Sequence, residues 1–398
     1  MSIRRCFLSL PFVLAMLGLG ACAGPKPLLP NVDVGAVARY RLAGYDAGAL
    51  RTIERRHFSS PPSLEVGWRA DLVRPSYGAG QAGPVPVIVY VPALGRASAA
   101  PNRWVDAWAR RGYAVFRVQP LSGDAAAWQS PAAIDGDFDA VARERYAADV
   151  MPRRIARLRT VLQALRARSR LREPDLDDLD WSHVAIAGSG LGAYTVQRIA
   201  ATGALPSFGV RAYLAISPYA VAARHRSRAS GAPILMVSSQ DDVDPDGMVS
   251  DPLARHLAFD RLRSGGEDYY LEFVSATHRW LDGATDEGTL QGDDAPDTAP
   301  FGGADDAASD GEGKPDAAAA RKEREAHRRA VRARSLLMTD TALAEVSFAD
   351  VTTAFLDANL RGRAAARSWL AGPAPRWLQG ARLKRRDGGR SLPARAPR

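Results

Sequence analysis

Four hydrophobic segments of this chain run directly into short stretches rich in glycine, serine, aspartate or histidine. In chain order they are VIVYVPALG at 87–95, VAIAGSGLGAY at 184–194, ILMVSSQDDVDP at 234–245 and FVSATH at 273–278. Serine, aspartate and histidine are the residue types of nucleophilic catalysis, in which an oriented imidazole activates a hydroxyl group. Glycine lets the backbone turn sharply and approach a ligand closely. These four segments are therefore the candidates for a catalytic site.

Strands that alternate with helices must position these segments. Near-continuous β-branched runs are typical of strands covered on both faces, whereas an alternating stretch is typical of a strand with one buried face. The predicted strands are 63–73, 85–91, 113–118, 184–187, 213–216, 234–237 and 271–274, and the predicted helices between them are 104–111, 141–172 and 193–201. This order predicts an α/β protein with a doubly wound, mostly parallel sheet and helices on both faces.

Taken together and in this order, the four segments resemble those of the α/β-hydrolase family, in its dienelactone-hydrolase and platelet-activating-factor-acetylhydrolase branch. Residues 184–194 resemble the nucleophile elbow, and residues 87–95 resemble the oxyanion strand and loop. The other two segments resemble the loops that carry the acid and the histidine. The resemblance covers roughly 63–282 and 346–370. It implies an α/β-hydrolase fold and esterase-like or lipase-like chemistry on a small-molecule ester.

The resemblance also implies roles for individual residues. Asp241 aligns with the acid that orients the histidine, with Asp242 as the neighbouring alternative, and His278 aligns with the general base. The backbone amides expected to stabilise an oxyanion are those of Ala93, Leu94 and Leu191. No metal ion or other cofactor is expected.

The chain departs from the family at the residue that would attack the substrate. The pattern G-x-S-x-G aligns with GSGLG at 188–192, so Gly190 occupies the seat of the serine. Ser189 as nucleophile would place Leu191 in the crowded turn and direct its own side chain away from His278. Loss of the nucleophile in a triad hydrolase lowers turnover by about six orders of magnitude. We therefore expect a hydrolase-like protein without ordinary serine-hydrolase activity that binds a ligand or an envelope partner.

Two alternatives remain open. In the first, the protein is an active carboxylic-ester hydrolase with a displaced nucleophile, for which Ser217 and Ser122 are candidates because they follow predicted strands. A serine hydroxyl within hydrogen-bond reach of His278 would favour this reading. In the second, the acidic stretch at 282–316 and the basic C-terminal tail act as a scaffold for other proteins.

The first 22 residues have the form of a targeting signal. Two arginines precede an apolar run at 6–19 that is too short for a comfortable membrane span. The sequence LGAC at 19–22 resembles a bacterial lipobox, which implies that Cys22 carries a lipid anchor in the membrane. The following Ala23, in place of aspartate, implies the outer membrane, facing the periplasm. Both cysteines of the chain lie in this segment, so no disulfide framework is expected.

Composition sets the remaining expectations. The 398 residues carry a formal net charge of +9, with the excess concentrated in arginines at 143–172 and in the tail. No nucleic-acid-binding motif accompanies these arginines, so we expect no nucleic-acid partner. The expected division is a signal peptide at 1–21, a tether at 22–45, a hydrolase domain at 46–282, a disordered acidic insert with a charged helix at 283–335, closing helices at 336–372 and a mobile basic tail at 373–398.

Overall fold

The computed structural model describes residues 31–61, 67–77, 83–219, 231–262, 267–285 and 317–386. The chain divides into two compact units, one of Met1–Asp33 with Ala307–Thr339 and one of Val34–Asp306 with Asp340–Arg398. The second unit contains the sheet and the described candidate site residues. Cys22 and the signal segment lie outside the described residues, as do residues 286–316 of the acidic insert.

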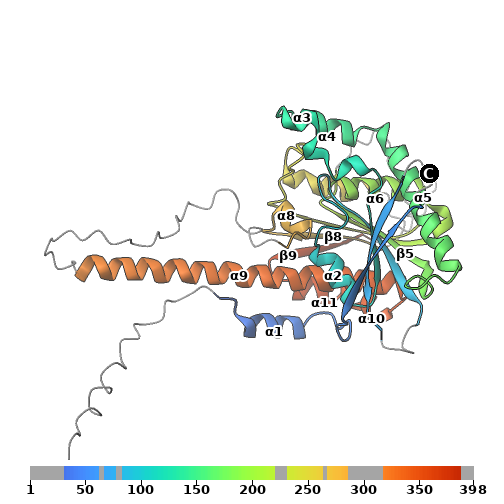
Figure 1. The fold of residues 1–398 in the computed structure, drawn as a ribbon. Coiled ribbons are helices and arrows are strands. Elements are labelled where there is room, and N and C mark those ends of the chain that lie inside the picture. Colours follow the sequence, from blue (N-terminus) through green and yellow to red (C-terminus); the bar gives the residue numbers. More distant parts are fainter. Residues whose placement is uncertain are drawn as a thin grey trace, which may run out of the picture. The chain divides into compact units, whose positions relative to one another are not determined.

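A nine-stranded mixed sheet forms the centre of the second unit within the described residues (Figure 1). The strand order is β1-β2-β4-β3-β5-β6-β7-β8-β9. Every neighbouring pair from β4 to β8 is parallel, whereas β1, β2 and β9 are antiparallel to their neighbours. The predicted α/β class with a mostly parallel sheet is thus confirmed. The strands are β1 (Ile53–Ser59), β2 (Arg69–Pro75), β3 (Val85–Val91), β4 (Ala114–Val118), β5 (Leu179–Ser189), β6 (Val210–Ile216), β7 (Ile234–Ser239), β8 (Asp268–Phe273) and β9 (Ala381–Arg386).

Alternate residues of the central strands contribute to two separate hydrophobic cores. On β3, Val87 and Val89 belong to one core, and Ile88 and Tyr90 belong to the other. Helices α5 (Val150–Arg170) and α6 (Leu191–Thr202) close the first core, and α2 (Arg103–Arg110), α9 (Ala317–Leu360) and α10 (Ala364–Ala371) contribute to the second. The shorter helical elements are α1 (Val34–Leu42), η1 (Ser122–Asp124), η2 (Ala127–Gln129), α3 (Pro131–Ile134), α4 (Phe138–Tyr146), η3 (Pro206–Phe208), η4 (Pro252–Arg255), α7 (His256–Asp260), α8 (His278–Leu281) and α11 (Pro373–Trp377).

Three local expectations need correction. The helix expected at 141–172 is two helices, α4 and α5, separated at 147–149. Pro152 lies in the first turn of α5, the one part of a helix where proline is readily accommodated. Within the expected tether, residues 34–42 form α1, whose buried Tyr40 stacks on Trp377 with 4.3 Å between ring centroids.

The expected mobile tail is also partly wrong. Residues 373–386 form α11 and the edge strand β9, which pairs with β8. Ala381 and Leu383 of β9 pack against the second core, while Arg382 and Lys384, which alternate with them, are exposed. Charged side chains are typical of edge strands, because they discourage pairing with another chain. Among the described residues, no helix is both long enough and apolar enough to cross a membrane.

Candidate functional site

The four segments identified in the sequence meet at one edge of the sheet. Gly190 follows β5 and Ala93 follows β3, while Asp242 and His278 follow β7 and β8. These strands run in parallel within one sheet, so their carboxyl ends lie along the same edge. The crevice outside the carboxyl ends of parallel strands is where open α/β sheets bind their ligands.

The turn from β5 into α6 requires the two glycines that flank Gly190. A Cβ atom on Gly188 would lie 2.8 Å from the carbonyl oxygen of Val91, and a Cβ atom on Gly192 would overlap the same oxygen. Helix α6 therefore begins directly against the end of β3. Gly190 itself has φ of 51° and ψ of −117°, a conformation that glycine adopts without the strain imposed on other residues.

The position of a side chain at residue 190 has space and faces the histidine. A Cβ atom there would lie 3.7 Å from Nε2 of His278 and 3.2 Å from Cβ of Ala93. The second distance demands a shift of a few tenths of an ångström in the backbone at Ala93, because its Cβ is fixed to that backbone. The structure thus provides room for a small side chain beside the imidazole, and the sequence places glycine there.

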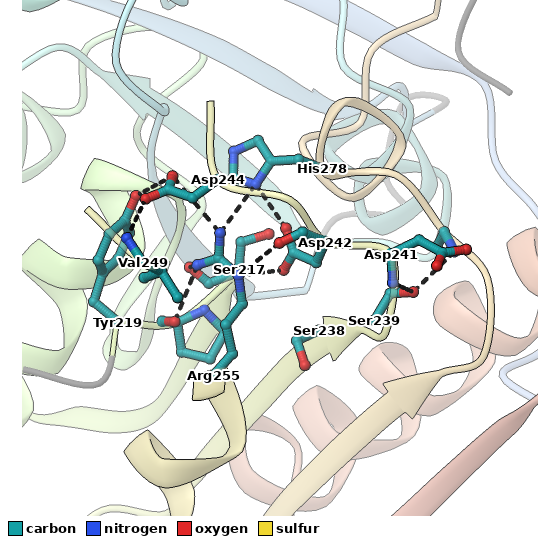
Figure 2. Close-up of polar contacts among 12 residues, drawn as sticks. Ser217, Tyr219, Ser238, Ser239, Asp241, Asp242, Asp244, Val249, Arg255 and His278 are labelled. Atoms are coloured by element: carbon teal, nitrogen blue, oxygen red, sulfur yellow. Dashed lines mark hydrogen bonds and ion pairs between the residues drawn. The ribbon is translucent and has the colours of Figure 1, made fainter. Parts of the chain in front are cut away.

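His278 pairs with Asp242 and not with Asp241. The Nδ1 atom of His278 donates a hydrogen bond to Oδ1 of Asp242 over 2.7 Å. Figure 2 shows Asp241 on the opposite side of the loop, where it is exposed and its backbone N–H donates to Ser239. Residues 242, 244 and 246 are buried, and the residues between them are exposed. The expected acid, Asp241, is therefore corrected to Asp242, because successive residues of this extended loop point to opposite sides.

A buried arginine shares Asp242 with the histidine. Arg255, at the end of η4, is fully buried, and its Nε lies 2.9 Å from Oδ2 of Asp242 (Figure 2). One terminal nitrogen of Arg255 lies 3.7 Å from Oδ1 of Asp244, and the other donates to two backbone carbonyl groups of the loop after β6. Arg255 therefore compensates the negative charge of two buried carboxylates. It also holds the loop after β7 against the loop after β6.

A second carboxylate approaches the other side of the imidazole. Oδ2 of Asp282, four residues after His278, lies 3.6 Å from Nε2 of His278. Burial by itself lowers the pKa of His278, but the carboxylates of Asp282 and Asp242 outweigh burial and raise this pKa to about 9. His278 is therefore cationic at neutral pH. A cationic imidazole cannot accept the proton of an attacking nucleophile, as a general base must.

The pairing of His278 can be tested by a histidine NMR titration. Asp242→Asn should lower the pKa of His278 by about one unit or more, because an opposite charge in direct contact favours the imidazolium form. Asp241→Asn removes a carboxylate from the same loop and should leave this pKa unchanged. An equal shift in both variants would contradict the assignment of Asp242.

The residues expected to form an oxyanion hole surround the same space. Ala93 borders the side-chain position of residue 190, Leu94 lines the adjacent pocket, and Leu191 is the first residue of α6. The first amides of a helix have no acceptor within the helix, and the helix dipole favours negative charge near them. The loop after β3 and the start of α6 therefore both border the side-chain position of residue 190, and the oxyanion hole stays a prediction.

Three serines remain as alternative nucleophiles, and their positions differ. Ser189 is fully buried, and its hydroxyl bonds with that of Tyr90 over 2.9 Å. Ser217 is also fully buried, with φ of 53°, and Ser122 is exposed in η1. In the described part of the chain, no serine hydroxyl forms a hydrogen bond with His278; its Nδ1 donates to Asp242, and its Nε2 lies 3.6 Å from Asp282.

A pocket of about 160 Å³ opens beside His278. It contains a further acid that belongs to the β7 loop, Asp246, which accepts a hydrogen bond from the hydroxyl of Tyr146 over 2.7 Å. Burial raises the pKa of Asp246 to about 6. The residues that line the pocket are Ala93, Leu94, Trp128, Phe138, Pro245, Asp246, His278 and Asp282.

Sequence reasoning missed three of the charged residues at this site. Asp282 carries a usable signal, because a residue four positions after His278 lies on the same helical face. Asp246 continues the every-second-residue pattern of the DDVDPD loop that begins with Asp242. Arg255 carries no such signal, since nothing in its local sequence distinguishes it from the many other arginines.

Among the residues that the structure describes, no group of three or more His, Cys, Asp or Glu side chains is arranged to hold a metal ion.

Comparison with known proteins adds no assignment: no protein-family model matches the chain, and no curated protein matches it. The geometry around Gly190 is therefore the basis for a functional proposal.

Proposed function

We propose that this chain is an α/β-hydrolase-like protein that binds a ligand beside Gly190 and lacks ordinary serine-hydrolase activity. One observation carries the proposal: the side-chain position of Gly190 lies 3.7 Å from Nε2 of His278, and no hydroxyl group stands there. In α/β-hydrolases the nucleophile occupies such a strand-to-helix turn, and the acid and the histidine follow it in the chain. Gly190, Asp242 and His278 keep that order.

Two further features oppose the hydrolase reaction at neutral pH. His278 is held in its cationic form between Asp282 and Asp242, so it is poorly able to act as a base. Asp242 is shared with Arg255, which draws part of its negative charge away from the imidazole. Without a covalent route, triad hydrolases retain only about 10³–10⁴-fold acceleration over water. A retained pocket beside an impaired catalytic group favours binding over turnover.

A fluorophosphonate probe tests this proposal on the purified full-length protein. We expect no covalent labelling at pH 7, because no serine hydroxyl in the described residues contacts His278. A known serine hydrolase and a heat-denatured sample serve as positive and negative controls. Labelling of the native protein at any serine of this site would contradict the proposal.

Active hydrolysis through a displaced serine is the second candidate. Ser217 is the observation in its favour: it combines φ of 53°, which is strained for serine, with a buried hydroxyl that has no partner among the described residues. If this candidate is correct, the probe should label the native protein and the Ser217→Ala variant should lose that label. Mass spectrometry of the labelled peptide identifies the residue directly.

We also propose that Cys22 anchors the protein to the outer membrane, facing the periplasm. The lipobox-like LGAC at 19–22 after an apolar run supports this proposal. Acyl chains hold a protein at a bilayer because each buried methylene group contributes about 0.8 kcal/mol.

Membrane fractionation in a diderm bacterium tests the anchor. Cys22→Ser should move the protein from the membrane fraction to the soluble fraction and abolish incorporation of labelled fatty acid. Cys6→Ser is the matched control, because it removes the other cysteine of the same segment, and it should stay at the membrane. Release of both variants, or of neither, would contradict an anchor at Cys22.

A further inference from the structure

The pocket beside Gly190 is small and has aromatic walls. Its volume of about 160 Å³ is below the roughly 300–1,000 Å³ that is usual for sites of drug-sized ligands. The rings of Trp128 and Phe138 meet edge to face, with 6.0 Å between their centroids, and both line the pocket. Phe138 is 53% exposed, which places it at the mouth. Any occupant must be small and must present apolar surface to these rings.

Buried contacts hold the aromatic wall in place. The indole ring of Trp128 lies so close to the backbone that a Cβ atom on Gly95 would overlap it. The backbone N–H of Gly95 donates to the carbonyl oxygen of Asp124 over 2.8 Å. The carboxylate of Asp124 in turn forms a buried ion pair with Arg154 of α5, at 2.8 Å. Residues 122–138, which carry Trp128 and Phe138 and are called the covering segment below, are therefore tied both to the loop after β3 and to helix α5.

Carboxylates outnumber cations in and directly behind the pocket. His278 is shared between Asp242 and Asp282, and Arg255 is shared between Asp242 and Asp244, so two cations face four carboxylates when Asp246 is included. Asp282 is 8% exposed, and its Oδ1 has no hydrogen-bond partner among the described residues. A buried carboxylate oxygen without a donor carries a large desolvation penalty. At and behind the pocket the buried carboxylates are Asp242, Asp244, Asp246 and Asp282. The buried cations in the same region are Arg255 and His278.

We propose that this pocket binds a small organic cation, an alkylammonium ion, with Asp246 and Asp282 as its counter-ions and the rings of Trp128 and Phe138 against its methyl groups. This inference rests on the proposed ligand-binding function and names the ligand class. Aromatic faces attract cations through the ring quadrupole, and several rings around one ammonium group form a common recognition device. The carboxylates supply the charge that an apolar pocket of the same size would lack.

An anionic ligand fits the same lining less well. His278 and the start of α6 would attract a negative group, but Nε2 of His278 already faces the carboxylate of Asp282 at 3.6 Å. A carboxylate ligand in the pocket would also meet Asp246. Like charges in a partly desolvated site repel strongly. Cation binding relieves the excess negative charge, whereas anion binding would increase it.

Choline, its uncharged isostere 3,3-dimethyl-1-butanol, and butyrate form a matched set of probes for calorimetry on the full-length protein. Choline should bind about tenfold or more tightly than the isostere, because only choline gains the charge and ring interactions. Asp246→Asn should remove about tenfold of the choline affinity and leave isostere binding unchanged. Trp128→Leu keeps the apolar volume but removes the ring, so it should weaken choline alone.

The pH dependence provides an independent readout. Asp246 must be ionised to attract the cation, and burial raises its pKa to about 6. Choline affinity should therefore change little between pH 7 and 8 and fall by about tenfold in total as Asp246 becomes protonated between pH 7 and 5, which is the loss expected for Asp246→Asn. His278 stays cationic throughout this range, since its pKa is about 9. The charged and titratable groups that face Asp246 are Tyr146 from α4, Tyr219 after β6, Asp244 from its own loop, His278 from α8 and Asp282 directly after α8.

The control variant is Asp135→Asn, which removes an exposed carboxylate from the covering segment outside the pocket and should change nothing. Circular dichroism of each variant confirms that it is folded. Equal binding of choline and its isostere, tighter binding of butyrate, or no binding of any probe would overturn the inference. Each of these results is independent of fluorophosphonate labelling, so failure of the cation site and failure of the proposed function can be told apart.

Discussion

Replacing Gly190 with serine is expected to create covalent reactivity toward fluorophosphonates that the unchanged protein lacks. A Cβ atom at this position lies 3.7 Å from Nε2 of His278, so a serine hydroxyl can reach the imidazole. The contact with Cβ of Ala93, at 3.2 Å, requires a shift of a few tenths of an ångström. Loss of the nucleophile lowers turnover by about six orders of magnitude in triad hydrolases, so a partly repaired site should still react at least ~100-fold faster than the unchanged protein.

The reactivity of Gly190→Ser should rise steeply with pH. Although burial lowers the pKa of His278, Asp282 and Asp242 raise it to about 9. At pH 7 roughly one imidazole in a hundred is then neutral and able to accept the serine proton. The inactivation rate should increase about tenfold per pH unit up to about pH 9. Adding Asp282→Asn removes one carboxylate, so it should lower the pKa of His278 and increase the rate at pH 7.

Inactivation rate constants between pH 6 and pH 10 measure both effects. Gly203→Ser is the matched control, because Gly203 also has a positive φ, of 62°, at the other end of α6, and open space surrounds it. This control should not react with the probe. Equal reactivity of the two serine variants, or a rate of Gly190→Ser that does not change with pH, would contradict the proposed role of His278.

Arg255→Met is expected to lower the free energy of unfolding by about 3–5 kcal/mol, which is the usual effect of removing one partner from a buried ion pair. The guanidinium group of Arg255 is fully buried and lies 2.9 Å from Asp242 and 3.7 Å from Asp244. Methionine fills a similar volume but leaves Asp244 without its cation and leaves Asp242 with His278 alone. The loss should therefore come from uncompensated charge and not from a cavity.

Urea denaturation at pH 7 measures this change. Arg153→Met replaces an exposed arginine of α5 and should alter the free energy of unfolding by less than about 0.5 kcal/mol. Adding Asp244→Asn to Arg255→Met removes one of the stranded charges and should restore part of the stability. A loss of less than about 1 kcal/mol in Arg255→Met would show that Arg255 does not compensate these carboxylates.

Much of the sheet could be predicted because its central strands are buried on both faces. Runs such as 85–91 and 234–237 have no polar face, and both are strands. The edge strands β1 and β9 escaped prediction for the opposite reason. Most of their side chains are accessible to solvent, so their sequences show no hydrophobic period. Their pairing is decided by the neighbouring strand and not by their own composition.

The sequence predicted which segments form the candidate site, but it did not predict every residue of the site. The glycines of the β5–α6 turn and His278 stand out, because a strained turn and a lone histidine after a strand are local features. The choice between Asp241 and Asp242 is not local. It depends on which side of the β7 loop faces α8, and a shift of one residue reverses that side.

The sequence by itself determined the α/β class, the glycine at position 190 and the segments that carry Asp242 and His278. Only the tertiary structure decided the electrostatics of the site. Arg255 and Asp246 follow β7, whereas Asp282 follows β8, and the three residues gather around His278 only because β7 and β8 lie side by side in the sheet. The charge state of His278 depends on its burial and on its distances to Asp282 and Asp242. These quantities cannot be read from the order of residues along the chain.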